Sequence, residues 1–472
     1  MSNSKISQAA ARITSLLDDN SFVEIGGLVS SRNTDFNLSD KDTPADGVIT
    51  GYGTIDDRLV YVYSQDSSVL GGSVGEMHAR KIAAIYDLAI KMGAPVIGLI
   101  DSVGLRLEEA GDALDAFGKI YAKQVEASGL IPQITAVFGN CGGGLAVASA
   151  LSDFTFMEGK NAKLFVNSPN TLAGNKTDDT ASAAFQSESS GLVDFMGSES
   201  EIFTQIRELI SILPSNFEDN NSVDPADDLN RASAIDAGLA DPAYVFAELG
   251  DGRIFTEVKK DFAKDMVTGF IRLGGTTVGV FGNRTAYTDD KGETVEIDSV
   301  LTTQGMYKAA DFVKFCDSFN IPVLSYTNTK GFEATKASER TIARAAAKLT
   351  SALASSDVPK VNLIAGDAYG SAYVVMNSKA IGADMTFALP DSKLGMMDAR
   401  LAAEIIYADE PDKIDEGAAK YEQLQTSITS AGARGLIDNV VEPANARKYL
   451  ISAFEMLYSK RTVSSGRKHT AI

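Results

Sequence analysis

Residues 131–144 read Ile131-Pro132-Gln133-Ile134-Thr135-Ala136-Val137-Phe138-Gly139-Asn140-Cys141-Gly142-Gly143-Gly144, and an alanine-rich segment follows. The pattern predicts a buried strand, a glycine turn and a helix that begins on that turn. Glycine tolerates positive φ and lets a ligand approach the backbone, and the first N–H groups of a helix have no intrahelical partner. The turn is therefore suited to bind an oxyanion. A purely structural, tight strand-to-helix crossing packed on glycine would give the same sequence pattern.

The chain contains a second copy of this segment. Three pairs of positions share an offset of 227: Ile131-Pro132 with Val358-Pro359, Gly139 with Gly366, and Gly143 with Gly370. Residues 93–96 and 320–323 keep the same offset. A constant offset across several strand-like segments indicates a duplicated domain. We therefore expect two similar α/β halves, with two oxyanion sites for two substrates.

Composition excludes several classes of protein. The 472 residues fit two domains of roughly 200 residues or a little more. The formal net charge of −20 argues against nucleic acid as a partner, because phosphate binding needs a basic face. The only cysteines, Cys141 and Cys316, lack metal-ligand spacing, which favours a reducing compartment and no zinc site. The sequence shows no apolar run of about 18 residues and no signal-peptide core, so we expect a cytoplasmic protein.

Both halves are expected to follow one order of elements. An amphipathic helix lies within residues 1–20, and a hairpin at residues 46–65 turns at Asp56-Asp57. Ser73 is expected to cap the next helix, with Glu76 completing a capping box.

A segment with the composition of a linker follows the first half. Pro, Asn and Asp are dense at residues 213–228, so we expect a boundary between about residues 215 and 250 and divide the chain into residues 1–245 and 246–472. The tail at residues 460–472 is expected to be loosely held.

The sequence lacks the residues that several classes of catalytic site require. His78 and His469 are the only histidines, and His78 is expected to be a structural hydrogen-bonding residue. A Ser-His-Asp triad, a histidine-bound metal and a nucleotide-binding glycine fingerprint are therefore not expected. Catalysis would rest on backbone donors, on positioning and on a base supplied by the substrate. Arg106 follows a buried strand, where it would contact a phosphate-bearing cofactor or pair at the surface with Glu108 or Glu109.

At these residues the chain resembles the biotin-dependent acyl-CoA carboxyltransferase family. That family includes the β subunits of propionyl-CoA and acetyl-CoA carboxylases and the α subunits of sodium-pumping methylmalonyl-CoA and glutaconyl-CoA decarboxylases. The resemblance covers about residues 10–460 and rests on residues 46–66, 71–78, 139–144, 312–322 and 368–376. It implies two crotonase-like domains, with acyl-CoA mainly on the N-terminal domain and carboxybiotin mainly on the C-terminal one. The site is expected between two subunits of a hexamer built as a trimer of dimers.

The resemblance also implies site residues. The oxyanion hole for the thioester enolate falls on Gly143 and Gly144, and the hole for the biotin ureido oxygen on Gly370, Ser371 and Ala372. Further substrate-binding positions are Gly71, Gly72, Ser102, Gly104, Arg106, Tyr373 and Val374, and no metal is expected. In such a site carboxybiotin releases carbon dioxide, its ureido nitrogen takes the α-proton, and the enolate captures carbon dioxide. The reverse order decarboxylates a malonyl-type thioester.

Three departures from the family pattern limit how far the family's substrate specificity applies to this chain. Relatives often read Ser-Gly-Gly-Ala-Arg at residues 102–106, where the bulkier Val103 and Leu105 are expected to narrow the CoA-side pocket. Ser371 replaces the second of two glycines, and Val374 stands where relatives often have a substrate-selecting Asp. Specificity for propionyl-CoA therefore does not carry over.

The expected partners follow from what the sequence lacks. It has no Ala-Met-Lys-Met biotin site and no ATP-binding loop, so biotin is expected on a separate carrier protein. Biotin carboxylase or membrane decarboxylase subunits would complete the enzyme, and the direction of transfer stays open, with a slight tilt toward the decarboxylase type. Two other functions are a crotonase-type enoyl-CoA hydratase or isomerase, which would need no biotin, and a non-catalytic assembly subunit.

Overall fold

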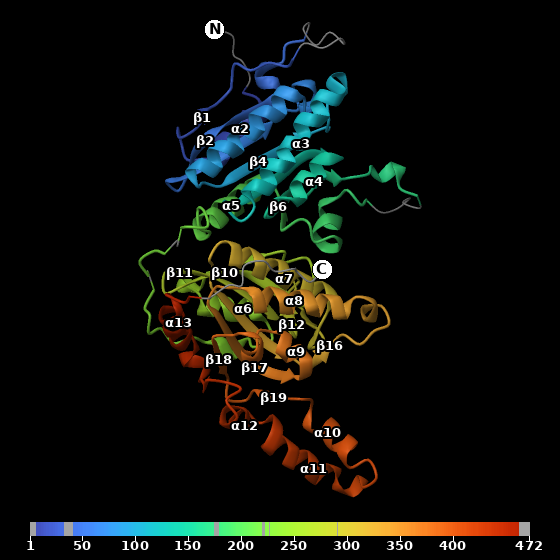
Figure 1. The fold of residues 1–472 in the computed structure, drawn as a ribbon, viewed down its shortest axis with the longest axis vertical. Helices are drawn as coiled ribbons and strands as arrows, with labels where there is room; N and C mark the ends of the chain where they lie inside the picture. Colours follow the sequence, from blue (N-terminus) through green and yellow to red (C-terminus); the bar gives the residue numbers. More distant parts are fainter. Residues whose placement is uncertain are drawn as a thin grey trace. The chain divides into compact units, whose positions relative to one another are not determined.

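The computed structural model describes residues 6–32, 41–173, 179–219, 222–225, 227–289 and 291–461. The chain forms two compact units, residues 1–221 and 222–472 (Figure 1). The boundary falls inside the expected interval of residues 215–250 but before the expected division at residue 245. Residues beyond 221 join the second unit because α6 (Pro242–Leu249) buries Val245, Phe246 and Leu249 in the second core.

The first unit is built on an eight-stranded sheet. In sheet order the strands are β1 (Val23–Glu24), β2 (Val48–Ile55), β3 (Arg58–Gln65), β4 (Val96–Ser102), β5 (Gln133–Gly142), β6 (Phe154–Glu158) and β8 (Phe195–Gly197), and β7 (Lys163–Phe165) also pairs with β5. The first three strands are antiparallel, and the rest are parallel. The helices are α1 (Gln8–Leu16), α2 (Glu76–Met92), α3 (Ala110–Ala127), α4 (Gly144–Ala150) and α5 (Glu199–Ile212). Helices α2 and α3 lie side by side (Figure 1).

The second unit repeats this sheet. Its strands run in the order β9 (Thr256–Val258), β10 (Met266–Leu273), β11 (Thr276–Asn283), β15 (Val323–Thr329), β17 (Lys360–Tyr369), β18 (Met385–Ala388) and β20 (Asn439–Val440), with β19 (Lys393–Gly395) also on β17. Besides α6, its helices are α7 (Thr303–Ser318), α8 (Ile342–Ser355), α9 (Gly370–Val375), α10 (Ala399–Ile406), α11 (Ile414–Tyr421), α12 (Ile428–Ala433) and α13 (Ala446–Leu457). Because both sheets have the same strand order, the predicted duplication is confirmed.

The connection between hairpin and helix differs between the units. Ten residues (66–75) join β3 to α2, whereas nineteen (284–302) join β11 to α7. The longer connection forms β12 (Ala286–Thr288), β13 (Thr294–Glu296) and β14 (Val300–Leu301), which pairs with β16 (Gly331–Phe332). The second unit therefore carries extra structure where the first has only a short loop.

Of two local predictions, the hairpin turn is confirmed and the helix cap is wrong. The first hairpin turns at Asp56 and Asp57, which have φ angles of 47° and 63°. The predicted cap at Ser73 is wrong, because α2 begins after Gly75. Ser73 instead accepts a hydrogen bond from Nε of Arg106 at 3.2 Å, which a local pattern cannot reveal. Most of the tail, residues 462–472, lies outside the described residues.

A buried lysine anchors the hairpin in each unit. Lys81 and Lys308 are 227 positions apart, and their side chains donate only to backbone carbonyls in the hydrogen bonds described. Nζ of Lys308 lies 2.7 Å from the Lys259 oxygen, 2.8 Å from that of Phe262 and 2.7 Å from that of Met266. Burial lowers the pKa of Lys308 to about 7 and that of Lys81 to about 8. Each helix is thus tied to the segment that enters the hairpin.

Lys308 should make stability rise with pH. The folded pKa of about 7 lies below the unfolded value of about 10.4, so the unfolded chain binds more protons between these values. The free energy of unfolding should therefore increase with pH there, by at most about 1.4 kcal/mol per pH unit. Denaturant titrations from about pH 7 to about pH 10 should show a shallower slope in Lys308→Met than in wild type, and the slope that remains is the contribution of Lys81. The control is Lys336→Met, which removes an exposed lysine; identical slopes for wild type and Lys308→Met would contradict the assignment.

Candidate functional site

A bulge interrupts the central strand of each unit near its carboxyl end. The register between β4 and β5 shifts between Ile100 and Ser102, where β5 carries two extra residues. The register between β15 and β17 shifts between Thr327 and Thr329, again with two extra residues on β17. A bulge bends its strand and re-aims the residues beyond it. In both units those residues are the glycine turn.

The first turn is held open by Gly143. Its φ of 61° and ψ of −125° form a conformation essentially restricted to glycine. The N–H of Gly143 donates to the carbonyl of Phe165 at 2.9 Å, so the prediction of Gly143 as an oxyanion donor is wrong. The next two N–H groups, of Gly144 and Leu145, occupy the first turn of α4, and neither has a partner among the described residues. The available pair of donors is therefore one residue further along than predicted.

The second turn has the same construction. Gly370 has a φ of 59°, and α9 begins on it. Ser371 and Ala372 follow in the first turn of that helix, where N–H groups have no intrahelical acceptor. Ser371 is exposed, whereas Ala372 is buried. Gly370, Ser371 and Ala372 are thus placed as the sequence predicted, and their role remains a prediction.

The predicted CoA-side glycines gather beside the first turn. The N–H of Val103 donates to the carbonyl of Gly71 at 3.1 Å, which joins the loops after β3 and β4. Ser102 is buried, and its Oγ accepts the N–H of Gly104 at 3.1 Å. Gly104 faces the carbonyl of Gly142, and a Cβ there would lie 3.4 Å from that oxygen. Three strand ends therefore meet at one edge, where α/β sheets bind ligands.

Gly72, also predicted to bind substrate, is a buried member of the same edge. A Cβ on it would lie 2.4 Å from the carbonyl oxygen of Asp101, and its φ is 66°. Only glycine fits both conditions.

Arg106 does not reach this edge. Its side chain is 0% exposed and pairs with Asp46 at 2.6 Å and Glu109 at 2.8 Å. Its Nη2 also donates to the carbonyl of Ser73 at 2.7 Å. The predicted contact with a phosphate is therefore wrong, because no donor faces solvent. The alternative partner Glu109 is correct, although the pair is buried and not at the surface.

His78 belongs to the same buried network. Its Nδ1 lies 2.9 Å from the carbonyl oxygen of Asp46, and its backbone N–H donates to Oδ2 of Asp46 at 2.7 Å. Burial lowers the pKa of His78 to about 3, so the ring is neutral at physiological pH. The prediction of a structural histidine is confirmed.

Tyr373 and Val374 follow the second turn within α9. Tyr373 is buried in a cluster with Ile364, Ala368 and Leu394, and Val374 packs against the same cluster. Burial raises the pKa of Tyr373 to about 12, so its hydroxyl stays protonated. Both residues belong to α9 and pack that helix against the cluster, and selection of a substrate by Val374 stays a prediction.

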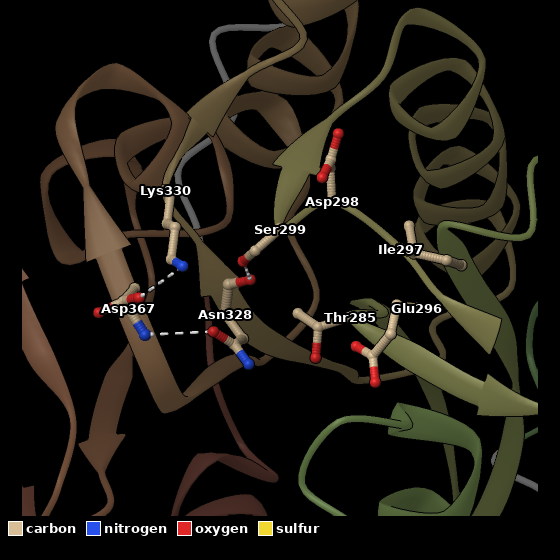
Figure 2. Close-up of a pocket in the computed structure, with 8 residues that line it drawn as sticks. All are labelled: Thr285, Glu296, Ile297, Asp298, Ser299, Asn328, Lys330 and Asp367. Carbon is tan, nitrogen blue, oxygen red and sulfur yellow. Dashed lines mark hydrogen bonds and ion pairs between the residues drawn. The ribbon is translucent and has the colours of Figure 1, made fainter. Parts of the chain in front are cut away.

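A pocket of about 450 Å³ opens in the second unit close to this turn (Figure 2). It is lined by Thr285, Glu296, Ile297, Asp298, Ser299, Asn328, Lys330 and Asp367. Lys330 and Asp367 point toward one another, with 3.9 Å between Nζ and Oδ2 (Figure 2). Asp367 precedes Gly370 by three residues on the chain, and the extra connection after β11 supplies the opposite wall. With three carboxylates and one ammonium, the pocket suits a ligand that donates hydrogen bonds.

The sequence analysis did not predict two residues that contribute to the first glycine turn. Leu145 carries one of the free N–H groups, and the hydroxyl of Tyr121 donates to the carbonyl of Gly144 at 2.6 Å. Tyr121 and Phe117 in α3 also occupy the space that a Cβ on Gly144 would need. No sequence signal links Tyr121 to Gly144, because they meet only when α3 packs beside α4.

No group of three or more His, Cys, Asp or Glu residues is arranged to bind a metal ion in the part of the chain that the structure describes. Among the helices described, none combines the length and apolarity needed to cross a membrane.

Known proteins share this architecture. The family described as "Carboxyl transferase domain" matches residues 7–472. The chain is 37% identical over 477 residues to the methylmalonyl-CoA decarboxylase α subunit of Veillonella parvula, covering 98% of this chain and 92% of that protein. It is 38% identical over 484 residues to the propionyl-CoA carboxylase carboxyltransferase subunit of Haloferax mediterranei, with coverage of 98% and 92%.

A solved structure agrees with the sequence matches. The crystal structure of transcarboxylase 12S, reported as a hexamer with hydrolysed methylmalonyl-coenzyme A bound, has a TM-score of 0.90 at 32% identity and covers 98% of this chain and 91% of that chain. The predicted α/β fold of two duplicated crotonase-like domains is confirmed.

Gly143→Ala should strain the turn without a clash. A Cβ on Gly143 meets no atom within 4 Å, so the cost comes from the backbone and should be about 1–3 kcal/mol. Gly118→Ala is the matched control, because Gly118 lies inside α3 with equally open space. That variant should gain about 0.5–1 kcal/mol. Denaturant unfolding measures both changes, and a Gly143→Ala variant as stable as Gly118→Ala would show that the turn tolerates a side chain.

Proposed function

We infer, on the premise that this chain belongs to the carboxyl transferase domain family, that it moves a carboxyl group between biotin and the α-carbon of a short-chain acyl-CoA. The chain is a carboxyltransferase of the propionyl-CoA carboxylase or methylmalonyl-CoA decarboxylase type. The observation that carries the proposal is the pair of glycine turns, each of which presents the N–H groups of a helix start beside a strand end.

The first turn is proposed to hold the thioester. The N–H groups of Gly144 and Leu145 would donate to the thioester oxygen, which gains negative charge when the bond between the α-carbon and its carboxylate breaks. Fixed donors of this kind need no reorganisation as charge develops, and each is worth about 10²–10³ in rate. The carboxyl group leaves as carbon dioxide, and the electron pair remains on the enolate. The hydroxyl of Tyr121 keeps the peptide of Gly144 in place.

The second turn is proposed to hold the ureido end of biotin. The N–H groups of Ser371 and Ala372 would donate to the ureido oxygen, and the neighbouring pocket offers acceptors to the ring N–H groups. Biotin, when bound, supplies the nitrogen that exchanges a proton for the carboxyl group. These residues fit such a ligand because a cyclic urea presents one acceptor between two donors. Neutral His78 and buried Arg106 take no part in the reaction.

The two turns are proposed to work across subunits. The structural relative transcarboxylase 12S forms a hexamer, and this chain is expected to assemble as an oligomer of that type. We place the reaction between the first unit of one subunit and the second unit of another, in a trimer of dimers. A biotin carrier protein and either biotin carboxylase or membrane decarboxylase subunits would complete the enzyme in the cytoplasm. Relatives of both types match equally well, so the partner chains would set the direction.

The activity can be tested with free biotin. The purified chain should decarboxylate malonyl-CoA or methylmalonyl-CoA only when biotin is present, and the faster substrate identifies the acyl group. Consumption of enoyl-CoA without biotin would instead favour a hydratase or isomerase. If the chain showed neither activity, the result would favour a non-catalytic assembly subunit.

Ser371→Pro should slow the biotin-dependent step. Proline removes the N–H yet is tolerated in the first turn of a helix. We expect kcat to fall by about 10²–10³ while KM for the thioester stays unchanged. Ser371→Ala keeps the N–H and should retain activity within a few-fold, so it isolates the contribution of the donor. Equal kcat values for the two variants would remove Ser371 from the oxyanion hole.

A further inference from the structure

One side chain from the neighbouring strand fills the bulge in each unit, and its charge differs between the units. Asp101 in β4 and Asn328 in β15 are 227 positions apart. A Cβ on Gly139 would lie 2.0 Å from Oδ1 of Asp101, and one on Gly366 would lie 2.3 Å from Oδ1 of Asn328. Each side chain therefore rests directly against the bulged strand, which is why both facing positions are glycine.

The second unit holds Asn328, through its side chain and its backbone, with neutral groups. Oδ1 of Asn328 accepts the N–H of Asp367 at 3.2 Å, inside the bulge (Figure 2). The backbone N–H of Asn328 donates to Oδ1 of Asn283 at 2.9 Å, and the side-chain amide of Asn283 donates to the Asn328 carbonyl. The group that fills this bulge is therefore uncharged.

The first unit places a carboxylate in the bulge and balances it with arginine. Arg12 donates from Nη1 to Oδ2 of Asp101 at 3.1 Å, and Oγ of Ser67 donates to the same oxygen at 3.1 Å. The side chains of Arg12 and Asp101 are 4% and 15% exposed, so an unpaired carboxylate would be costly there. Arg12 also pairs with Glu199 at 2.9 Å and lies 4.8 Å from the centre of the Phe138 ring.

Arg12 therefore contacts the bulge directly at Phe138 and indirectly through Asp101. Phe138 is one of the bulged residues, and Asp101 presses on Gly139 next to it. The chain beyond Gly139 leads within five residues to the N–H group of Gly144. Because a bulge sets the direction of the strand beyond it, a shift of Asp101 would turn the donors away from the thioester oxygen. Oxyanion donors act only when they are accurately placed.

We propose that Arg12 is a positioning residue for the acyl-CoA half of the reaction. By pairing with Asp101 it fixes the bulge of β5, and thereby the N–H groups of Gly144 and Leu145. The proposal rests on the function proposed above. The second turn is independent of it, because Asn328 fills the corresponding bulge without an arginine.

A double variant tests the proposal directly. Arg12→Met removes the charge and should lower kcat for biotin-dependent decarboxylation by at least about tenfold, with KM for biotin unchanged. Adding Asp101→Asn makes the first bulge resemble the second. The double variant should recover to within about threefold of wild type, because an amide needs no counter-charge. Arg207→Met is the control, since Arg207 pairs with Asp18 and Asp56 and makes the same change of charge.

Hydrogen exchange supplies a readout that needs no activity. Arg12→Met should speed exchange in residues 133–146 and leave residues 360–373 unchanged, and the double variant should restore the slow rate. Faster exchange throughout the first unit, or a double variant no more active than Arg12→Met, would overturn the proposal. Equal kcat values for Arg12→Met and Arg207→Met would do the same. If wild type transfers no carboxyl group, the proposed function fails, while the exchange rates still decide the role of Arg12.

Discussion

One steric constraint underlies both halves of this protein: the central strand has two more residues than its neighbour and must bulge. The bulge is accommodated because Gly139 and Gly366 have no Cβ, so that Asp101 and Asn328 can occupy the space. Beyond it, a glycine at positive φ reverses the chain into a helix, and the first N–H groups of that helix are left without acceptors. The donors proposed to act in catalysis are thus a consequence of backbone geometry.

The residues around the glycine turn differ between the two units. The first has a short glycine loop beside its turn and a charged pair behind its bulge. The second has nineteen residues in the corresponding connection, a polar pocket of about 450 Å³ and a neutral bulge. These differences agree with the proposal that the first unit binds the thioester and the second binds biotin. An extended thioester and a compact urea ring need different surrounding residues around similar N–H donors. Duplication supplied the donors twice, and the loops adapted each copy.

Features that depend on local or repeated patterns could be predicted from the sequence. The offset of 227 identified the duplication, and the turn at Asp56-Asp57 followed from a short polar interruption between two alternating segments. The errors concern groups whose partners are distant in sequence. Arg106 was expected near a ligand, yet it is buried against Asp46, sixty residues away. The N–H of Gly143 is occupied because β7, which follows the helix, returns to pair with β5. The strand–glycine–helix pattern located the turn and the resemblance assigned its residues, but only the paired backbone shows which N–H groups are free.

The most direct measurement is a crystal structure of the assembled chain with a stable thioester analogue and biotin bound. The account predicts that the thioester oxygen lies within hydrogen-bonding distance of the nitrogens of Gly144 and Leu145, and the ureido oxygen near those of Ser371 and Ala372. The bond from Gly143 to Phe165 should remain intact. Either oxygen bound away from these N–H groups, or held by a side chain instead, would contradict the account.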